Sequence, residues 1–82
     1  MIQTQHFKDM LSERNIRIEW VDETLEKPDN TEEHEDGTIH FLKKVQERDN
    51  KWLRVIVNNT SLPKKLITAF FDRRLKRKYN ES

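Results

Sequence analysis

Two amphipathic helices are predicted at the start of the chain. Within residues 4–15 and again within residues 17–27, apolar side chains recur with the 3.6-residue period of an α-helix. Thr4 is suited to cap the first helix and Asn15 to end it, because asparagine tolerates the left-handed conformation found after helices. Pro28 ends the second helix, because the residue before a proline avoids the α region. The two stripes consist of Phe7, Met10, Leu11 and Arg14, followed by Ile18, Val21 and Leu25.

After the second helix the period of the pattern changes from 3.6 to 2, which is typical of strands. Asp36-Gly37 between two such runs is a strong signal for the turn of a β-hairpin. We therefore expect four strands, a short acidic one at about 31–35 and longer ones at 38–47, 51–58 and 64–71.

Alternation along these strands assigns their side chains to two faces of one sheet. The apolar face is expected to contain Ile39, Phe41, Val45, Leu53, Val55 and Val57. On the last strand, the pair Leu66 and Phe70 opposes the pair Ile67 and Phe71, and the pattern leaves open which pair is buried.

Short connections between successive strands favour an antiparallel meander. The stripes of the two helices need an apolar surface to cover, and the apolar face of the sheet is the only large one. We therefore predict an α+β fold in which two N-terminal helices pack on one face of a four-stranded antiparallel meander. The opposite face is expected to be open and to carry His40, Lys44, Trp52 and Arg54.

Composition narrows the class of protein further. The chain has 82 residues, of which 38% are charged, and it has no cysteine. This predicts one small domain with a compact core and without disulfides or thiolate zinc sites. The sequence shows neither a secretory signal nor an apolar run of membrane-spanning length, so a cytoplasmic protein is expected.

The net charge of +1 conceals a separation of charge along the chain. Residues 22–36 carry eight acids against Lys27 alone, whereas residues 64–78 carry seven lysines and arginines against Asp72. A basic block of this density attracts a polyanion, because each neutralised phosphate releases a counterion. The alternative is a solvated basic tail that balances the acidic segment of the same fold.

Several classes of site lack their sequence signature. Gly37 is the only glycine, which excludes a glycine-rich phosphate loop. His6, His34 and His40 fall on different predicted elements, so we expect no metal site and no cofactor. The serines lie in no nucleophile motif.

The remaining imidazole and guanidinium groups suit RNA cleavage without a metal. Histidine transfers protons near neutral pH, which makes His40 and His6 candidates for the acid or base. Arg54 is a candidate for holding phosphate, since a guanidinium offers two parallel donors. Each residue also has a purely structural interpretation: His6 beside the helix stripe, His40 exposed on its strand, and Arg54 paired with an acid across the sheet.

Four segments carry a resemblance to a known family. They are the helix with His6 and Arg14, and residues 36–41, 52–58 and 66–74. Over about residues 5–78 the chain resembles a widespread bacterial family of small uncharacterised domains, similar in layout to the RelE/ParE and BrnT toxins of type II toxin–antitoxin systems.

This resemblance implies a single RelE/BrnT-like domain over residues 1–82, structured over about 5–78 and with a basic tail at 72–82. It also implies a metal-independent ribonuclease of the mRNA interferase type, whose partners are RNA, including ribosome-associated mRNA, and an antitoxin protein. The candidate catalytic residues are then His40, Arg54 and His6. The expected nucleic-acid-binding residues are Lys44, Trp52, Arg73, Arg74, Arg77 and Lys78.

Two other functions stay open at this point. One is a non-catalytic interaction module that binds a protein or a nucleic acid through the open sheet face and the basic tail. The other is a ParE-like gyrase inhibitor, which shares the fold and lacks the nuclease site.

Overall fold

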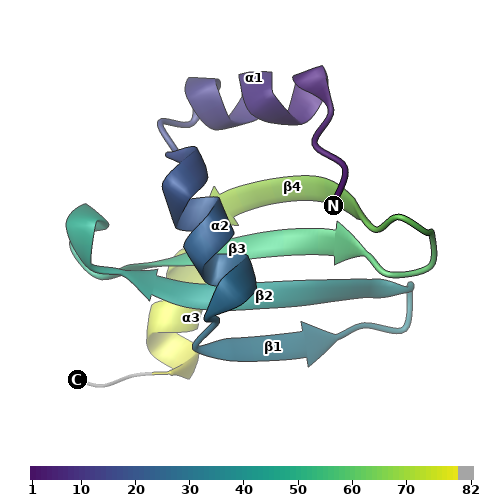
Figure 1. The fold of residues 1–82 in the computed structure, drawn as a ribbon. Coiled ribbons are helices and arrows are strands. Elements are labelled where there is room, and N and C mark those ends of the chain that lie inside the picture. The colour runs from purple at the N-terminus through teal and green to yellow at the C-terminus, as the bar shows by residue number, and fades with distance from the viewer. Residues whose placement is uncertain (80–82) are drawn as a thin grey trace.

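The computed structural model describes residues 1–79 and confirms the predicted α+β class, with two N-terminal helices and a four-stranded antiparallel meander (Figure 1). α2 crosses β2 and β3 on one face of the sheet, which we call the front face, and α1 runs beside β4. Within residues 1–79, no helix combines the length and the apolar content needed to cross a bilayer. The elements are α1 (Gln5–Glu13), α2 (Ile18–Glu26), β1 (Asn30–Glu33), β2 (Thr38–Val45), η1 (Gln46–Arg48), β3 (Lys51–Asn58), β4 (Lys65–Phe71) and α3 (Arg73–Lys78).

Local signals in the sequence set the boundaries of these elements. The hydroxyl of Thr4 accepts a hydrogen bond from the backbone N–H of Phe7 at 3.1 Å, which caps α1 as predicted. Asn15 follows α1 with a φ of 56°, the predicted left-handed conformation. Gly37 has a φ of 87° in the turn between β1 and β2, where a residue with a side chain would be strained.

The strands pair in sequence order, and every pair is antiparallel. The register places Phe41 opposite Val55 and Leu42 opposite Arg54. Between β3 and β4 it shifts by one residue, because Val57 pairs with Leu66 whereas Ile56 pairs with Thr68.

This irregularity decides the question that alternation left open on the last strand. Leu66 is buried in the core, Phe71 packs against it, and Ile67 is 42% exposed. Each of the two predicted pairs therefore contributes one residue to the core. A β-bulge breaks the period of 2, so alternation alone could not give this answer.

The main core lies between the two N-terminal helices and the front face. It contains Phe7, Met10 and Leu11 of the predicted stripe of α1, whereas Arg14 of that stripe is exposed. It also contains the predicted central strand, in which Val55 and Leu53 are fully buried. Ile16, Trp20 and Thr24 are also buried, although the helical stripe alone did not include them. The buried residues of this cluster are Phe7, Met10, Leu11, Ile16, Trp20, Val21, Val45, Leu53, Val55, Val57, Leu66 and Ala69.

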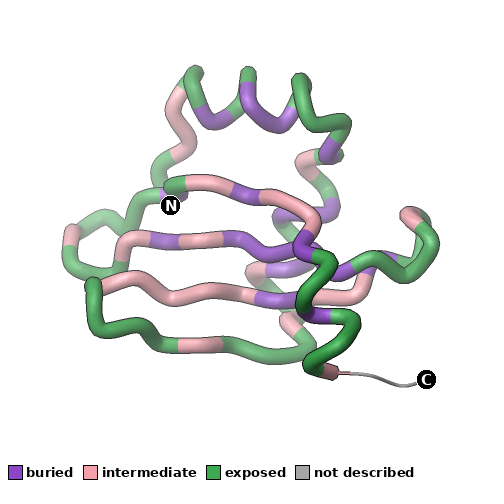
Figure 2. Tube along the Cα trace, turned by 180° about the vertical axis from the view of Figure 1, so that it is seen from behind, coloured by how far each residue is buried: buried purple, intermediate pink, exposed green. Residues whose placement is uncertain are grey.

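The opposite face of the sheet, the back face, is not open as predicted. Residues 73–78, expected as part of a basic tail, form α3, and its Leu75 is buried against Leu42 and Trp52 of the back face. The burial view from behind shows α3 lying against one end of the sheet, while β1 is mostly exposed (Figure 2). The expected tail was wrong over 73–78 because one apolar residue within a basic run gives almost no periodic signal. Residues 80–82 of that tail lie outside the described residues.

Candidate functional site

A concave site lies on the back face beside α3. Its volume is about 350 Å³. β1, β2 and β3 supply its floor, and α3 supplies one wall. The lining residues are Glu32, His34, His40, Arg54, Arg74, Leu75 and Lys78.

Arg54 lies at the floor of this site and is only 8% exposed. Its Nε donates to Oδ2 of Asp72 at 2.9 Å, and its Nη1 donates to Oε1 of Glu32 at 3.1 Å. Nη1 also lies 2.6 Å from Nδ1 of His40. The prediction of an exposed Arg54 is therefore wrong, while the alternative of pairing with acids is confirmed. The guanidinium is held in one orientation by two carboxylates and an imidazole.

Asp72 links Arg54 to the start of α3. Its carboxylate is buried and accepts hydrogen bonds from the backbone N–H of Arg74, which caps the helix, and from Nε and Nη2 of the same arginine. These bonds from Arg74, with a smaller contribution from Arg54, lower the pKa of Asp72 to about 2 despite its burial. Asp72 thus fixes both arginines at the edge of the site.

Glu32 on β1 is the second carboxylate of the network. It accepts from Nζ of Lys78 at 2.9 Å, from Arg54, and from Nε2 of His34 at 3.1 Å. The bond from Lys78 is the main reason that the pKa of Glu32 falls to about 2, and the bonds from His34 and Arg54 add to it. The acidic edge strand and the basic C-terminal segment therefore meet at this pair.

His34 and His40 stack with their ring centroids 3.7 Å apart and an interplanar angle of 15°. The two histidines belong to different segments, as expected from the sequence, but their rings come together in the fold. The hairpin turn at Asp36-Gly37 brings His34 back beside β2. In the register of β1 and β2, Glu32 lies directly opposite His40. The register implied by this turn could have revealed His34, which the sequence analysis did not include among the site residues.

The surroundings of His40 favour its neutral imidazole. Burial lowers the pKa of His40 first, and the neighbouring charges of His34 and Arg54 lower it further. Since Arg54 donates to Nδ1, the proton of the neutral ring is on Nε2, 3.2 Å from the hydroxyl of Thr38. A neutral histidine beside a fixed arginine is suited to accept a proton once the arginine engages another acceptor.

Glu32, His34 and His40 are of residue types that also bind metal ions. One ligand atom each from Glu32, His34 and His40 lies within 4.8 Å of the others, and this donor set is typical of transition-metal sites. However, Arg54 and Lys78 donate into this cluster, and they would oppose a cation at the same point. Because three cations, Arg54, Arg74 and Lys78, meet the two carboxylates of Glu32 and Asp72 here, the net charge of the site is positive and favours an anion.

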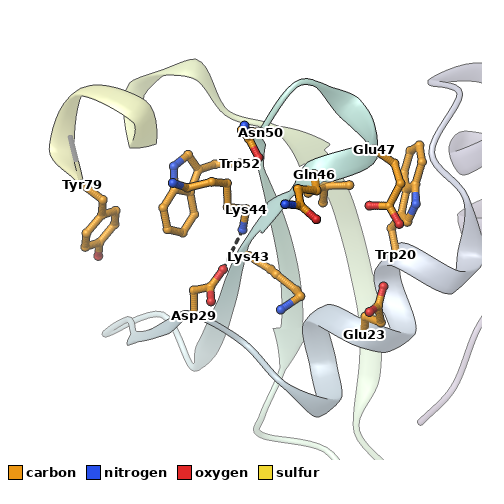
Figure 3. A pocket seen from close by; sticks show the side chains of 11 residues that line it. Trp20, Glu23, Asp29, Lys43, Lys44, Gln46, Glu47, Asn50, Trp52 and Tyr79 are labelled. Carbon is orange, nitrogen blue, oxygen red and sulfur yellow. Dashed lines mark hydrogen bonds between the residues drawn. The ribbon is translucent and has the colours of Figure 1, made fainter. Parts of the chain in front are cut away.

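The remaining predicted site residues fall into separate places. Trp52 is buried beneath α3, with its ring 5.2 Å from that of Tyr79, so the prediction of an open Trp52 is wrong. Lys44 lines a second pocket, shown in Figure 3. His6 lines a third pocket on α1 and is not joined to His40. Arg73 and Arg77 are exposed on α3, whereas Arg74 and Lys78 line the back-face site.

Comparison with known proteins gives one match. A family model described as a domain of unknown function (DUF4258) matches residues 3–71, which include β1 to β4 and end before α3. No curated protein and no solved structure matches the chain.

Proposed function

The chain belongs to the DUF4258 family of domains of unknown function, and from its back-face site we propose that it binds RNA and cleaves it without a metal ion. The observation that carries this proposal is the convergence of two histidines, one carboxylate and three cations in a single concavity. Metal-independent cleavage of RNA needs these groups: a base, an acid, and cations beside the phosphate.

The cations supply the phosphate-binding part of the site. Arg54 is fixed at the floor, and Arg74 and Lys78 stand at the wall formed by α3. A phosphate oxygen entering the site would accept from Nη1 of Arg54, which already donates to two other acceptors there. The same cations would stabilise the additional negative charge of the pentacoordinate phosphate in the transition state.

The two histidines supply the proton transfers. When a phosphate oxygen takes the bond from Arg54, Nδ1 of His40 becomes free to accept the proton of the ribose 2′-hydroxyl. The 2′-oxygen then forms its bond to phosphorus, the bond from phosphorus to the 5′-oxygen breaks, and His34 gives a proton to the leaving 5′-oxygen. Glu32 orients the His34 ring through Nε2. The products are a 2′,3′-cyclic phosphate and a 5′-hydroxyl.

The sequence resemblance to RelE/ParE and BrnT toxins supports the same function. Under that resemblance, the protein would act as an mRNA interferase and an antitoxin protein would be its partner. The residues of the back-face site support the proposal more strongly than the resemblance does, because proteins of one fold have many different functions.

Cleavage of a short RNA in EDTA tests the proposal, with an oligonucleotide of the same sequence but 2′-deoxy sugars as the uncleavable control. We expect the His40→Ala and His34→Ala variants to cleave about 10²–10⁴-fold more slowly than the parent, the usual contribution of general acid–base catalysis. His6→Ala is the matched control, because His6 lines a different pocket, and it should cleave like the parent.

Two results would contradict the proposal. RNA that is bound but left intact between about pH 5 and pH 9 would favour the non-catalytic interaction module instead. Absence of RNA binding at about 50 mM salt would remove the nucleic-acid function altogether, because phosphate contacts are strongest at low salt.

A further inference from the structure

A second pocket, with a volume of about 750 Å³, begins at Tyr79 after α3 and extends along the end of the sheet to α2 (Figure 3). It follows the end of the sheet where β2 passes through η1 into β3. Trp52 and Tyr79 form one end of this pocket, and Trp20 and Glu23 of α2 form the other. We call it the end pocket. A volume of this size accommodates a nucleotide-sized ligand.

The end pocket differs from the back-face site in charge. It is lined by three carboxylates, Glu23, Asp29 and Glu47, against two lysines, Lys43 and Lys44. The ammonium of Lys43 is itself bound to the backbone carbonyl of Lys27 at 3.0 Å. This balance disfavours a phosphate group and leaves carboxylate acceptors for a group that donates hydrogen bonds.

Aromatic and hydrogen-bonding groups occur together in this pocket. Tyr79 packs on Trp52, and the buried indole N–H of Trp52 has no hydrogen-bond partner among residues 1–79, which is rare for a buried donor. Asp29 points toward the same end and accepts from the backbone N–H of Lys44 at 2.8 Å (Figure 3). A flat ring that carries an amino group would match an aromatic wall beside a carboxylate.

The two pockets also share their walls. On β3, Arg54 faces the back-face site and Trp52 faces the end pocket. They lie two residues apart on the same face of the strand, about 7 Å from each other along it. At the end of α3, Lys78 lines the first pocket and Tyr79 lines the second. A chain held by its phosphate at Arg54 can thus place an adjacent base in the end pocket.

We propose that the end pocket binds an RNA base that carries an exocyclic amino group, in preference to uracil, next to the phosphate held by Arg54. This proposal rests on the proposed function for the identity of the ligand. Asp29 accepts a hydrogen bond from the amino group, as carboxylates do from N4 of cytosine. Uracil presents a carbonyl oxygen at that position, which a carboxylate repels. Tyr79 stacks on the ring and does not distinguish one base from another.

Titrations with cytidine 3′-monophosphate and uridine 3′-monophosphate test this proposal, because the two probes differ mainly in the amino group. Binding is followed by tryptophan fluorescence, since Trp20 and Trp52 both line the pocket. We expect the cytidine probe to bind about tenfold more tightly, in line with the discrimination that one good base contact provides. Asp29→Asn should abolish this preference, because the amide retains an oxygen for the N–H of Lys44 but loses the charge.

Two further variants complete the test. Asp9→Asn, on α1 in the pocket of His6, is the matched control and should keep the preference. Tyr79→Leu should weaken both probes to the same degree, as expected for stacking. Equal affinity for the two probes, or an unchanged preference in Asp29→Asn, would overturn the proposal. If RNA is not cleaved but the preference for cytidine holds, the ribonuclease proposal is wrong and the base-pocket proposal is supported. If RNA is cleaved but the two probes bind equally, the base-pocket proposal is wrong and the ribonuclease proposal is supported.

Discussion

The two faces of the sheet are held by different interactions. On the front face, α1 and α2 bury apolar side chains, and the central Val55 is fully buried without any polar partner to satisfy. On the back face, the neighbouring Arg54 is nearly as buried, at 8% exposed, but it is surrounded by Asp72, Glu32 and His40 beside the short helix α3. The front face therefore stabilises the fold. The back face keeps charged groups fixed at a concave surface, as sites that bind ligands or catalyse reactions require.

The largest effect should come from placing a charge on the front face. Val55→Asp should unfold the domain, because an unpaired buried charge costs several kcal/mol against a total stability of about 5–15 kcal/mol. Thermal unfolding followed by circular dichroism measures this. Leu62→Asp is the control, since Leu62 is 92% exposed, and it should melt like the parent. A Val55→Asp variant with the melting temperature of the parent would show that the two faces are assigned wrongly.

Removing the charge at the centre of the back face should have a smaller but still large effect. Arg54→Met removes the buried partner of Asp72 and Glu32 and leaves them only their more exposed partners, Arg74 for Asp72, and Lys78 and His34 for Glu32. The cost should therefore approach, without exceeding, the roughly 3–5 kcal/mol of a fully broken buried pair. An Arg54 on an open sheet face, as expected from the sequence, would instead contribute little to stability. Urea unfolding at pH 7 provides the measurement.

Arg14→Met is the control for Arg54→Met, because Arg14 is exposed and donates to Thr68 and to the carbonyl of Ala69 without a carboxylate partner among residues 1–79. As a second test, Glu32→Gln should destabilise the Arg54→Met variant less than it destabilises the parent, since one partner of Glu32 is already absent there. Equal stability of Arg54→Met and the parent would mean that the network does not hold the back face together.

The smallest effect should appear in the dependence of stability on pH. The pKa values of Glu32 and Asp72 are about 2 in the folded protein, below those of unfolded carboxyl groups. Their contribution to the free energy of unfolding is therefore complete above about pH 5 and decreases as the pH falls toward 2. Urea unfolding between pH 2 and pH 7 should show a steeper acid loss in the parent than in Glu32→Gln. Identical slopes would argue against the network at Glu32.

Differences in physical origin also explain which parts of the molecule the sequence predicted. The two helices, the hairpin at Asp36-Gly37 and the core around Val55 follow from local periods and turn residues, and the structure confirms them. The back-face site depends on contacts between residues far apart in the chain, such as Lys78 with Glu32 and Arg54 with Asp72. No local period in the sequence predicts those pairs. The sequence shows only that residues 22–36 are acidic and residues 64–78 are basic.

Individual site residues show the same limit. Alternation correctly placed His40 and Arg54 on one face of adjacent strands. It could not show that Leu75 would turn a basic segment into a helix that buries Trp52. It also left out His34, which joins the site only because the hairpin returns it beside His40.

Binding of an RNA phosphate in the back-face site is tested most directly by one titration. A dinucleotide with a 2′-deoxy sugar at the cleavage position is added to nitrogen-15-labelled protein, and the side-chain signals of arginine and histidine are followed by NMR. We predict that the Nε signal of Arg54 and the ring signals of His34 and His40 shift together, with one dissociation constant. Shifts confined to the exposed Arg73 and Arg77, with those of Arg54 and the two histidines unchanged, would contradict the account.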